Sequence, residues 1–372
     1  MDPDKAKSLF EEGAVIIVED MPVGNEFGID YNWWNTGQKF QGLKMIPAGL
    51  HFIFSRASVT SQTNKTNNTL NANISNADLG SRCGFFHFFK KREIMWLQWH
   101  KRNEILVHKD SSQEDLERIR CNLRDLDQNL GPYPFENHEK WRCLSDHITE
   151  EIILKMQPLN IMITSVSQYL PKSYKSSRQN RYEAKSEDNI DIKLDPNCIL
   201  RFSDIPKRKF PNSSTPSEIT IHSMDKSYTL DYVIENCHNN NENQLLGELQ
   251  LSFICFLVAQ VYEGFEQWKR IVDLLCSCQS IVSKRAELYR SFLRIFSDQL
   301  REVPEDFFVD IVTRDNFLVT KLNELFSTLQ DSSLTNTELM TEANDFRQTL
   351  TARFQWDFES EPDEFAPIVV ME

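Results

Sequence analysis

Four oxygen-bearing side chains in the first half of the chain have the spacing of a calcium-binding loop. Asp125, Asp127 and Asn129, with Glu136 eleven residues after Asp125, stand at the places of positions 1, 3, 5 and 12 of such a loop. The sixth position makes a sharp turn that requires glycine, and this sequence has Leu130 there. We therefore interpret these residues as the solvated end of a helix.

A second set of side chains contains candidate zinc ligands. His138, Cys143 and His147 lie close in sequence, and positions 143 and 147 share a helical face. A structural zinc site uses four ligands in paired spacings, and no fourth ligand is evident here. Cys276 and Cys278 would point to different sides of a helix. We expect both sets to be buried or surface side chains without a metal, and we expect no cofactor.

Signatures of the common enzyme classes are missing. The chain contains no GxGxxG, GxxxxGKS/T, HExxH or GxSxG pattern. Its 372 residues carry 41 Lys and Arg against 55 Asp and Glu, a net charge of −14 that repels a bare phosphate backbone. The basic run 206–209 could be a nuclear-import signal or a weak phosphate contact. We favour a third interpretation, a solvated run of charge in a linker. Composition thus disfavours direct nucleic-acid binding.

Two features bear on the cellular compartment. The longest apolar region, Leu249–Val261, falls short of the ~18–20 residues that span a bilayer, and the first apolar run, Ala14–Val18, is shorter than the ~7–15 residues of a secretory signal. Eight cysteines without a CxxC pair suit free thiols in a reducing compartment. We expect a protein of the cytoplasm or nucleus that does not bind membranes.

Short β-branched and aromatic runs predict a β-rich N-terminal third. The expected strands are Ala14–Val18, Gly49–Phe54, Cys83–Phe89 and Glu93–Trp99. The charged residues 90–92 between the last two runs predict a hairpin turn. Trp33 and Trp34 are either an exposed binding platform or, as we favour, part of the core.

Helical periodicity dominates the remainder of the chain. Apolar residues spaced by three and four predict a helix over 116–130, with Ser111 and Glu114 as a capping pair, and a second helix over Trp141–Met156. From Ser217 to Glu361 there is a single proline, which favours a nearly all-α domain. The helices expected there cover 230–237, 249–261, 268–275, 286–300 and 315–329.

These patterns predict an α+β protein, with a β-rich N-terminal domain followed by an all-α C-terminal helical domain. The N-terminal domain and its closing helices span 1–156 and contain a polar insert at 58–80 that we expect to be mobile. Proline-rich residues 157–217 are expected to form a linker, 218–358 the helical domain and 359–372 an acidic C-terminal tail.

Nine short segments form a recognisable series from one end of the chain to the other. They are Glu26–Tyr31, Lys44–Phe52, Leu130–Pro134, His222–Asp225, Leu246–Gln250, Asp306–Val312, Asp315–Leu318, Phe354–Phe358 and Ala366–Val370. In this order they resemble the AAR-two splicing-factor family, the A-alpha-two repression proteins.

The resemblance implies a non-enzymatic assembly factor, or chaperone, of the U5 small nuclear ribonucleoprotein in pre-mRNA splicing. Members of the family bind the large U5 scaffold protein, a pre-mRNA-processing factor, through its C-terminal RNase-H-like and Jab/MPN-like domains. They do so in a cytoplasmic precursor and delay the U5 helicase until after nuclear import. The family fold joins a β-rich N-terminal domain to a helical domain and has no catalytic residues.

The end of the chain carries the candidate partner-binding residues. They are Phe365, Pro367, Ile368, Val369 and Val370. Three consecutive β-branched residues favour an extended backbone, and the preceding acids keep the segment solvated. We expect this segment to add a strand to a free sheet edge of the partner, because main-chain hydrogen bonds supply affinity in that mode.

Two other functions remain open on sequence alone. A helical-domain adaptor that docks peptides in trafficking would fit the C-terminal half equally well. An uncharacterised enzyme would need a polar pocket assembled from distant residues, which spacing in the sequence does not reveal.

Overall fold

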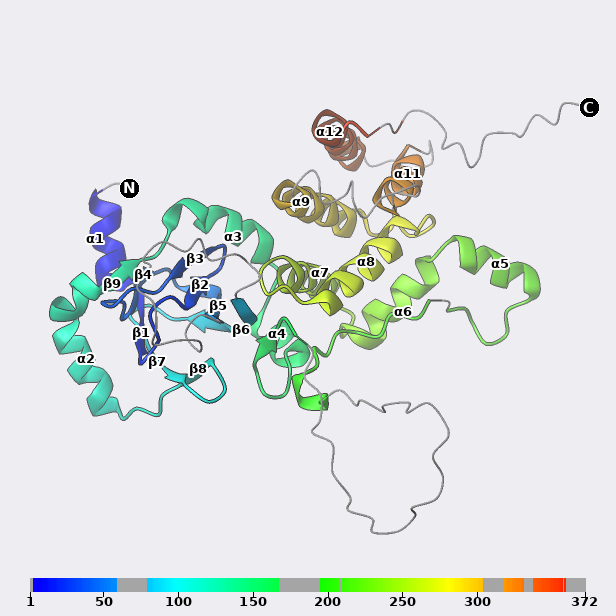
Figure 1. Ribbon diagram of the computed structural model, residues 1–372. Coiled ribbons are helices and arrows are strands. Elements are labelled where there is room, and N and C mark those ends of the chain that lie inside the picture. Colours follow the sequence, from blue (N-terminus) through cyan, green and yellow to red (C-terminus); the bar gives the residue numbers. More distant parts are fainter. Residues whose placement is uncertain are drawn as a thin grey trace, which may run out of the picture. The chain divides into compact units, whose positions relative to one another are not determined.

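The computed structural model describes residues 3–58, 79–166, 195–207, 209–303, 317–330, 337–356 and 358 (Figure 1). The chain divides into two compact units. Unit 1 comprises Met1–Phe135, Ile153–Arg201 and Leu257–Tyr262, and unit 2 comprises Glu136–Ile152, Phe202–Phe256 and Glu263–Glu372. The predicted fold class is confirmed: strands dominate the N-terminal part, and helices follow from residue 216 onward.

The boundaries of the two units differ from those of the predicted domains. Residues 136–152, expected with the β-rich domain, pack with the helical unit, and 257–262 pack with the β-rich unit. The described parts of the expected linker are shared, up to Arg201 by unit 1 and from Phe202 by unit 2. The expected insert at 58–80 is described only at Ser58 and at residues 79–80, which belong to strands.

Unit 1 contains two sheets, each with five strands among the described residues. Sheet A has the order β8 (Ile105–His108), β7 (Ile94–His100), β1 (Ala14–Glu19), β4 (Gly42–Ile46) and β9 (Leu130–Pro132). Sheet B has the order β10 (Ile163–Thr164), β6 (Leu79–Phe89), β5 (Gly49–Ser58), β2 (Glu26–Ile29) and β3 (Asn32–Asn35). Sheet B is antiparallel throughout, whereas β1 pairs in parallel with β7.

The four predicted strands are confirmed as β1, β5, β6 and β7, but the predicted hairpin at residues 90–92 is wrong. β6 already has β5 and β10 as neighbours, whereas β7 pairs with β1 and β8. Residues 90–92 therefore carry the chain from sheet B to sheet A. The apolar pattern of a strand reports which faces are buried and not which strand is its neighbour, so periodicity does not distinguish a hairpin from a connection between sheets.

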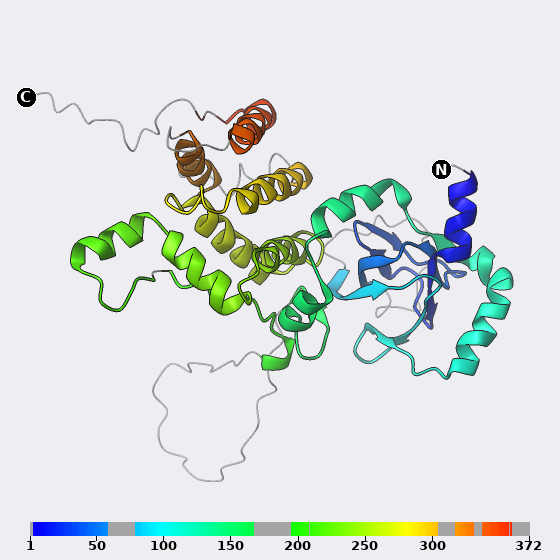
Figure 2. The same cartoon turned by 180° about the vertical axis from the view of Figure 1, so that it is seen from behind.

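Alternation along β1 places apolar side chains on both of its faces. Ala14, Ile16 and Val18 face a core cluster that includes residues of both sheets, and Val15 and Ile17 face a second cluster. Helix α2 (Gln113–Leu126) covers the second cluster (Figures 1 and 2). Helix α1 (Pro3–Glu12) packs near β4.

The helix predicted over 116–130 ends earlier than its apolar stripe. α2 is capped by Ser112 and Asp115, one residue after the predicted pair, and it ends at Leu126. A 3-10 turn at Asp127–Asn129 follows, and Leu130 begins β9. Leu130 still packs with Val15 and Ile17, in the same cluster as the apolar residues of α2. The apolar spacing therefore reflects a common core and not one continuous helix.

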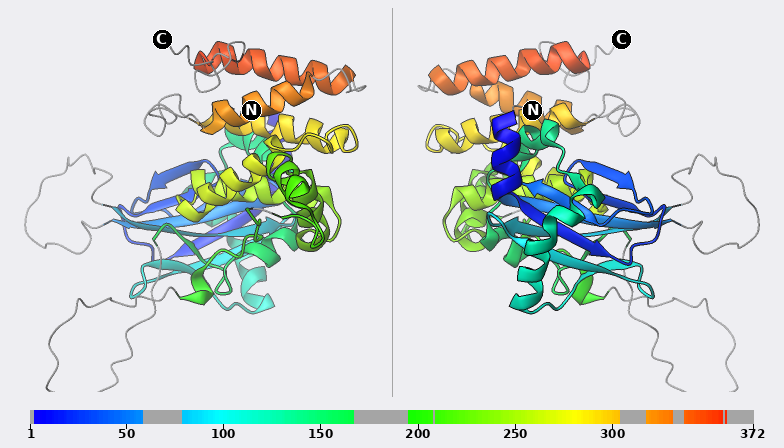
Figure 3. Two further views of the ribbon diagram at one scale, coloured as in Figure 1. Left: turned by 90° about the vertical axis from the view of Figure 1, so that its right-hand side faces the viewer. Right: turned by 90° about the vertical axis from the view of Figure 1, so that its left-hand side faces the viewer.

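Unit 2 is helical. Its helices among the described residues are α3 (His138–Ser145), α5 (Pro216–Met224), α6 (Ser227–Cys237), α7 (Glu242–Leu257), α8 (Tyr262–Cys276), α9 (Ala286–Glu302), α11 (Phe317–Leu329) and α12 (Thr337–Phe354). α11 and α12 pack together at one end, and α9 lies beside α12 (Figure 3). α5 buries none of its residues and extends away from the packed helices (Figure 2).

The predicted helix over Trp141–Met156 is observed as two helices, α3 and α4 (Glu150–Met156). The other predicted helices correspond to α6, α7, α8, α9 and α11. Within the described ranges, no helix combines the length and apolar character needed to cross a membrane.

Candidate functional site

Three of the segments that carry the family resemblance meet at one buried carboxylate in unit 1. Asp30, which follows β2 with a left-handed φ of 55°, accepts a hydrogen bond from the Phe52 amide (2.9 Å) at Oδ1. Its Oδ2 accepts from the Tyr133 hydroxyl (2.7 Å) and lies 2.7 Å from Nδ1 of His51. The second ring nitrogen of His51, Nε2, lies 3.0 Å from the Pro47 carbonyl oxygen. Three segments distant in sequence are thus joined at Asp30.

The carboxylate–histidine pair has the geometry of a general base and its orienting acid, but it lacks access to a substrate. The nitrogen that would take a proton, Nε2 of His51, faces a backbone carbonyl. Asp30, His51 and Tyr133 are all buried, and burial together with Asp30 holds the pKa of Tyr133 far above its ordinary value. The cluster therefore stabilises the fold.

A second buried carboxylate organises unit 2. Oε1 of Glu248 on α7 accepts hydrogen bonds from the Ser203 amide (2.7 Å) and from Nε2 of Gln267 (2.9 Å). Its Oε2 lies 3.2 Å from Nε2 of His238. His238 and Glu248 are fully buried, so removing the Glu248 carboxylate would leave His238, Ser203 and Gln267 without their shared partner.

The next polar residue of the same helix explains why two helices replace the predicted one. Oε1 of Gln250 accepts from the His147 amide (2.8 Å), and its Nε2 donates to Oδ1 of Asp146 (2.7 Å) and to the Cys143 carbonyl (3.1 Å). Gly247 lies against the same turn: a Cβ there would approach the His147 carbonyl oxygen to 2.4 Å. α7 therefore holds the turn between α3 and α4 through the side chain of Gln250, and Gly247, which has no side chain, allows the close approach.

Asp225, which ends α5, holds the loop after α8. Its carboxylate accepts hydrogen bonds from the amides of Ser227 (2.9 Å), Gln279 (2.9 Å) and Ser280 (3.2 Å). Burial opposes ionisation, but these bonds and the Ser227 hydroxyl outweigh it and lower the pKa of Asp225 to about 2.

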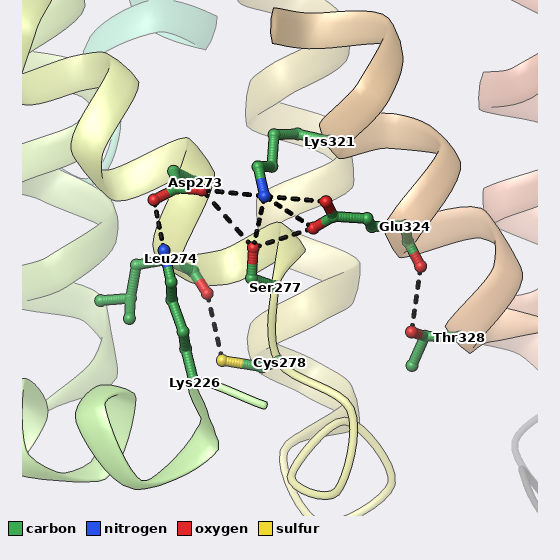
Figure 4. A network of polar contacts seen from close by, with 8 residues as sticks. All are labelled: Lys226, Asp273, Leu274, Ser277, Cys278, Lys321, Glu324 and Thr328. Carbon is green, nitrogen blue, oxygen red and sulfur yellow. Dashed lines mark hydrogen bonds and ion pairs between the residues drawn. The ribbon is translucent and has the colours of Figure 1, made fainter. Parts of the chain in front are cut away.

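An ion-pair network joins α6, α8 and α11 beside this loop (Figure 4). Asp273 on α8 pairs with Lys226 and, at 3.2 Å, with Lys321 of α11. Lys321 also binds Glu324 (2.8 Å) and the Ser277 hydroxyl (3.0 Å). Burial opposes ionisation of Asp273, but Lys226 and Lys321 outweigh it and lower its pKa. Two lysines and two carboxylates balance in charge in this network, so it links the helices.

The residues with calcium-loop spacing, which we interpreted as the solvated end of a helix, have other partners. Asp127 pairs with Lys44 of β4, and Glu136 lies in the 3-10 turn Phe135–Asn137. Among the residues that the structure describes, no three His, Cys, Asp or Glu side chains are grouped so as to hold a metal ion.

The candidate zinc ligands also have other surroundings. His147 has Nε2 3.0 Å from Nη2 of Arg294, and burial with the nearby Asp298, Glu139 and Asp146 raises the pKa of the Cys143 thiol. α8 ends at Cys276, and Cys276 and Cys278 are both buried. Burial raises the pKa of Cys278 to about 12, so neither is a poised thiolate.

A groove of about 490 Å³ between α9 and α12 is lined largely by charged side chains. Each of its arginines has a carboxylate partner: Arg290 binds Glu342 (2.7 Å), Arg294 lies 3.3 Å from Asp146, and Arg301 lies 3.1 Å from Asp298. Arg290 and Arg294 thus connect α9 to other segments, Arg301 pairs within α9, and each of the three guanidinium groups already has a carboxylate partner.

The interpretation of Trp33 and Trp34 as core residues is wrong. Their exposed fractions are 56% and 39%, and among the described residues β3 is an edge strand of sheet B with β2 as its neighbour. They form the exposed platform that the sequence left as the alternative.

One side of this platform rests on a buried arginine. The Arg82 guanidinium lies 4.3 Å from the centroid of the Phe54 ring and 5.6 Å from that of Trp33. Arg82 donates to Glu26 Oε1 (2.7 Å) and to the Val258 carbonyl (2.6 Å). Arg82 was not among the candidates from the sequence. The signal available there was an arginine directly before a strongly apolar run. The structure places it opposite Arg56 in the β5–β6 register.

The tail residues expected to bind a partner, Phe365, Pro367, Ile368, Val369 and Val370, lie outside the described residues. What remains among the described residues is a fold held by buried polar clusters and a set of exposed apolar surfaces.

Comparison with known proteins places the chain in one class. Residues 12–158 match the AAR2 N-terminal domain, and residues 202–359 match the AAR2 C-terminal repeat region. Together these two matches span most of the chain.

Full-length relatives agree. The chain is 40% identical to the Protein AAR2 homolog of Mus musculus and 39% identical to that of Homo sapiens, over 100% of this chain and 96% of each relative. It is 24% identical to the A1 cistron-splicing factor AAR2 of Saccharomyces cerevisiae over 86% of this chain and 85% of that protein. The chain belongs to the AAR2 family, a family of splicing factors and not a known enzyme family.

Replacing Asp30 with Asn should destabilise the protein by about 3 kcal/mol, because three donors lose their buried carboxylate. Tyr133→Phe, which removes only one of these donors, should cost about 1 kcal/mol. Urea unfolding followed by fluorescence measures both values. Equal midpoints for Asp30→Asn and the parent chain would show that the cluster does not stabilise the fold.

Asp225 predicts a defined pH dependence. Its folded pKa of about 2 lies below that of an unfolded aspartate, so its stabilisation is complete above about pH 4 and is lost as the pH falls toward 2. Asp225→Asn should therefore lower stability at pH 6 by about 1 kcal/mol, a value reduced for partial solvent screening. The difference from the parent chain should vanish near pH 2. A constant difference across this range would contradict the assignment.

Proposed function

We propose that this chain is a non-enzymatic assembly factor, or chaperone, of the U5 small nuclear ribonucleoprotein. It binds the C-terminal RNase-H-like and Jab/MPN-like domains of the large U5 scaffold protein in pre-mRNA splicing. The observation that carries the proposal is similarity along the whole chain to a family that includes a protein named as a splicing factor.

The arrangement of the described residues supports a binding role. The polar residues of five resemblance segments are used inside the fold, at Asp30, His51, Tyr133, Asp225 and Glu248. Asp30, His51, Tyr133 and Glu248 are buried and Asp225 is half-buried, and all five position helices or strands. Large apolar side chains are instead exposed at several places, including Trp33, Met224 and Tyr262, as expected where a protein presents contact surface.

The tail supplies one contact in this proposal. Phe365, Pro367, Ile368, Val369 and Val370 pair as an added strand with a sheet edge of the scaffold's C-terminal domains. Assembly of this kind takes place in the cytoplasm, and entry into the nucleus with the scaffold would place the protein there as well.

Deleting residues 361–372 should weaken binding to the scaffold's C-terminal fragment by about 1–3 kcal/mol, the range for one short strand with a few buried side chains. Calorimetric titration of the parent and shortened chains gives the difference. Unchanged affinity with a lowered melting temperature would show that the tail belongs to the protein's own fold.

The purified chain should not bind U5 RNA tightly without the scaffold protein. Its net charge of −14 opposes a phosphate backbone. Fluorescence anisotropy at several salt concentrations measures this. Nanomolar, steeply salt-dependent binding at physiological salt would refute an indirect association with RNA.

A further inference from the structure

The four sheet edges among the described residues differ in how they are protected from pairing with another strand. β10 has two residues, and β9 has three residues and ends at Pro132, which lacks an amide donor. β8 is bounded by the charged residues Glu104 and Lys109. β3, with the sequence Asn-Trp-Trp-Asn, contains no proline, charge or register shift. β3 therefore lacks the devices that usually block an edge.

The pairing register shows which main-chain groups of β3 point outward. The Thr36 amide donates to the Asn25 carbonyl (2.8 Å) and the Thr36 carbonyl accepts from the Gly24 amide (2.8 Å), so the main-chain groups of Thr36 point toward the β2 side. Bonded and non-bonded pairs alternate along an antiparallel ladder, which makes Trp34 opposite Phe27 bonded and Trp33 opposite Gly28 non-bonded. The amides and carbonyls of Trp33 and Asn35 thus point away from β2, toward the free edge.

Side chains make this edge adhesive on both faces. Successive residues of a strand point to opposite faces, so Trp33 and Trp34 offer an indole on each side of the edge. Trp33 is held in place over the Arg82 guanidinium, which reduces the entropy it loses on binding. A strand that pairs here gains main-chain hydrogen bonds and two aromatic contacts.

Charge selects the kind of strand. Of the charged residues in 21–46, Glu26 and Asp30 are buried and Lys44 is paired with Asp127, which leaves Lys39 as the exposed charge. In a chain of net charge −14, this stretch presents no exposed carboxylate. It suits an apolar strand that carries no basic residue, and it does not repel an acidic one.

We infer that the outer edge of β3 is a second docking site for the scaffold protein, which adds an extended, apolar segment without basic residues to sheet B. This inference rests on the proposed function for the identity of the partner. It is separate from the tail contact, because there this chain supplies the strand, whereas here it supplies the edge.

The edge is tested by removing one outward donor. Asn35→Pro deletes the outward amide and leaves the β2 pairing intact, and Asn35→Ala is the matched control that keeps the amide. Trp34→Lys adds a charge at the edge, and Leu154→Lys, at an exposed leucine of the same unit, is its control. Each variant is titrated with the scaffold's C-terminal fragment after its melting temperature has been compared with that of the parent chain. Amide hydrogen exchange of residues 32–36 is measured with and without the fragment.

Binding of the fragment should slow exchange at Trp33 and Asn35. Asn35→Pro should bind about tenfold more weakly than Asn35→Ala at equal melting temperature, and the loss should persist when residues 361–372 are deleted. If the parent chain binds the fragment while Asn35→Pro and Asn35→Ala bind equally and exchange is unchanged, the inference is wrong and the proposed function stands. If the parent chain does not bind the fragment, the proposed function fails and the edge loses its assigned partner. Protection of residues 32–36 in the free chain that disappears with the tail would identify the tail as the occupant and contradict the inference.

Discussion

The arrangement of unit 1 depends on the buried carboxylate of Asp30. It accepts from the Phe52 amide and the Tyr133 hydroxyl and pairs with His51, so it holds β5 and the segment after β9 to the turn between β2 and β3. A buried carboxylate without these partners would be costly, which makes the arrangement all-or-none. The left-handed backbone at Asp30 turns the chain from β2 into β3 and so creates the edge that carries Trp33 and Trp34.

Unit 2 follows the same principle with different residues. Glu248 accepts hydrogen bonds from Ser203 and Gln267 and faces His238. Gln250, two residues further along α7, shapes the junction of α3 and α4. Five of the segments that resemble the splicing-factor family thus owe their composition to internal hydrogen bonds. A family resemblance carried by such residues identifies the fold reliably but does not mark the surface that meets a partner.

Much of the fold could be predicted from the sequence, because apolar periodicity reports burial directly. β1, β5 and the helices α6 to α9 follow from it. The prediction of a hairpin at 90–92 was wrong because tertiary packing decides which strands pair. The prediction of one helix over 141–156 was wrong because the residue that shapes its interruption, Gln250, lies a hundred residues away in sequence. Trp33 and Trp34 were assigned to the core because aromatic residues near strands usually lie there, and only sheet order reveals that β3 is an edge. Arg82 escaped notice since its partners, Glu26 and Val258, are distant in the chain.

Family membership, buried polar residues in the resemblance segments and exposed apolar side chains together support the proposal that this protein acts by holding another protein. The most direct test is affinity isolation of the full chain from cytoplasmic extract of its own cells, with the bound proteins identified by mass spectrometry. The account predicts the large U5 scaffold protein as the main partner, without the U5 helicase. Recovery of trafficking cargo, or of no U5 component while the chain remains folded, would contradict it.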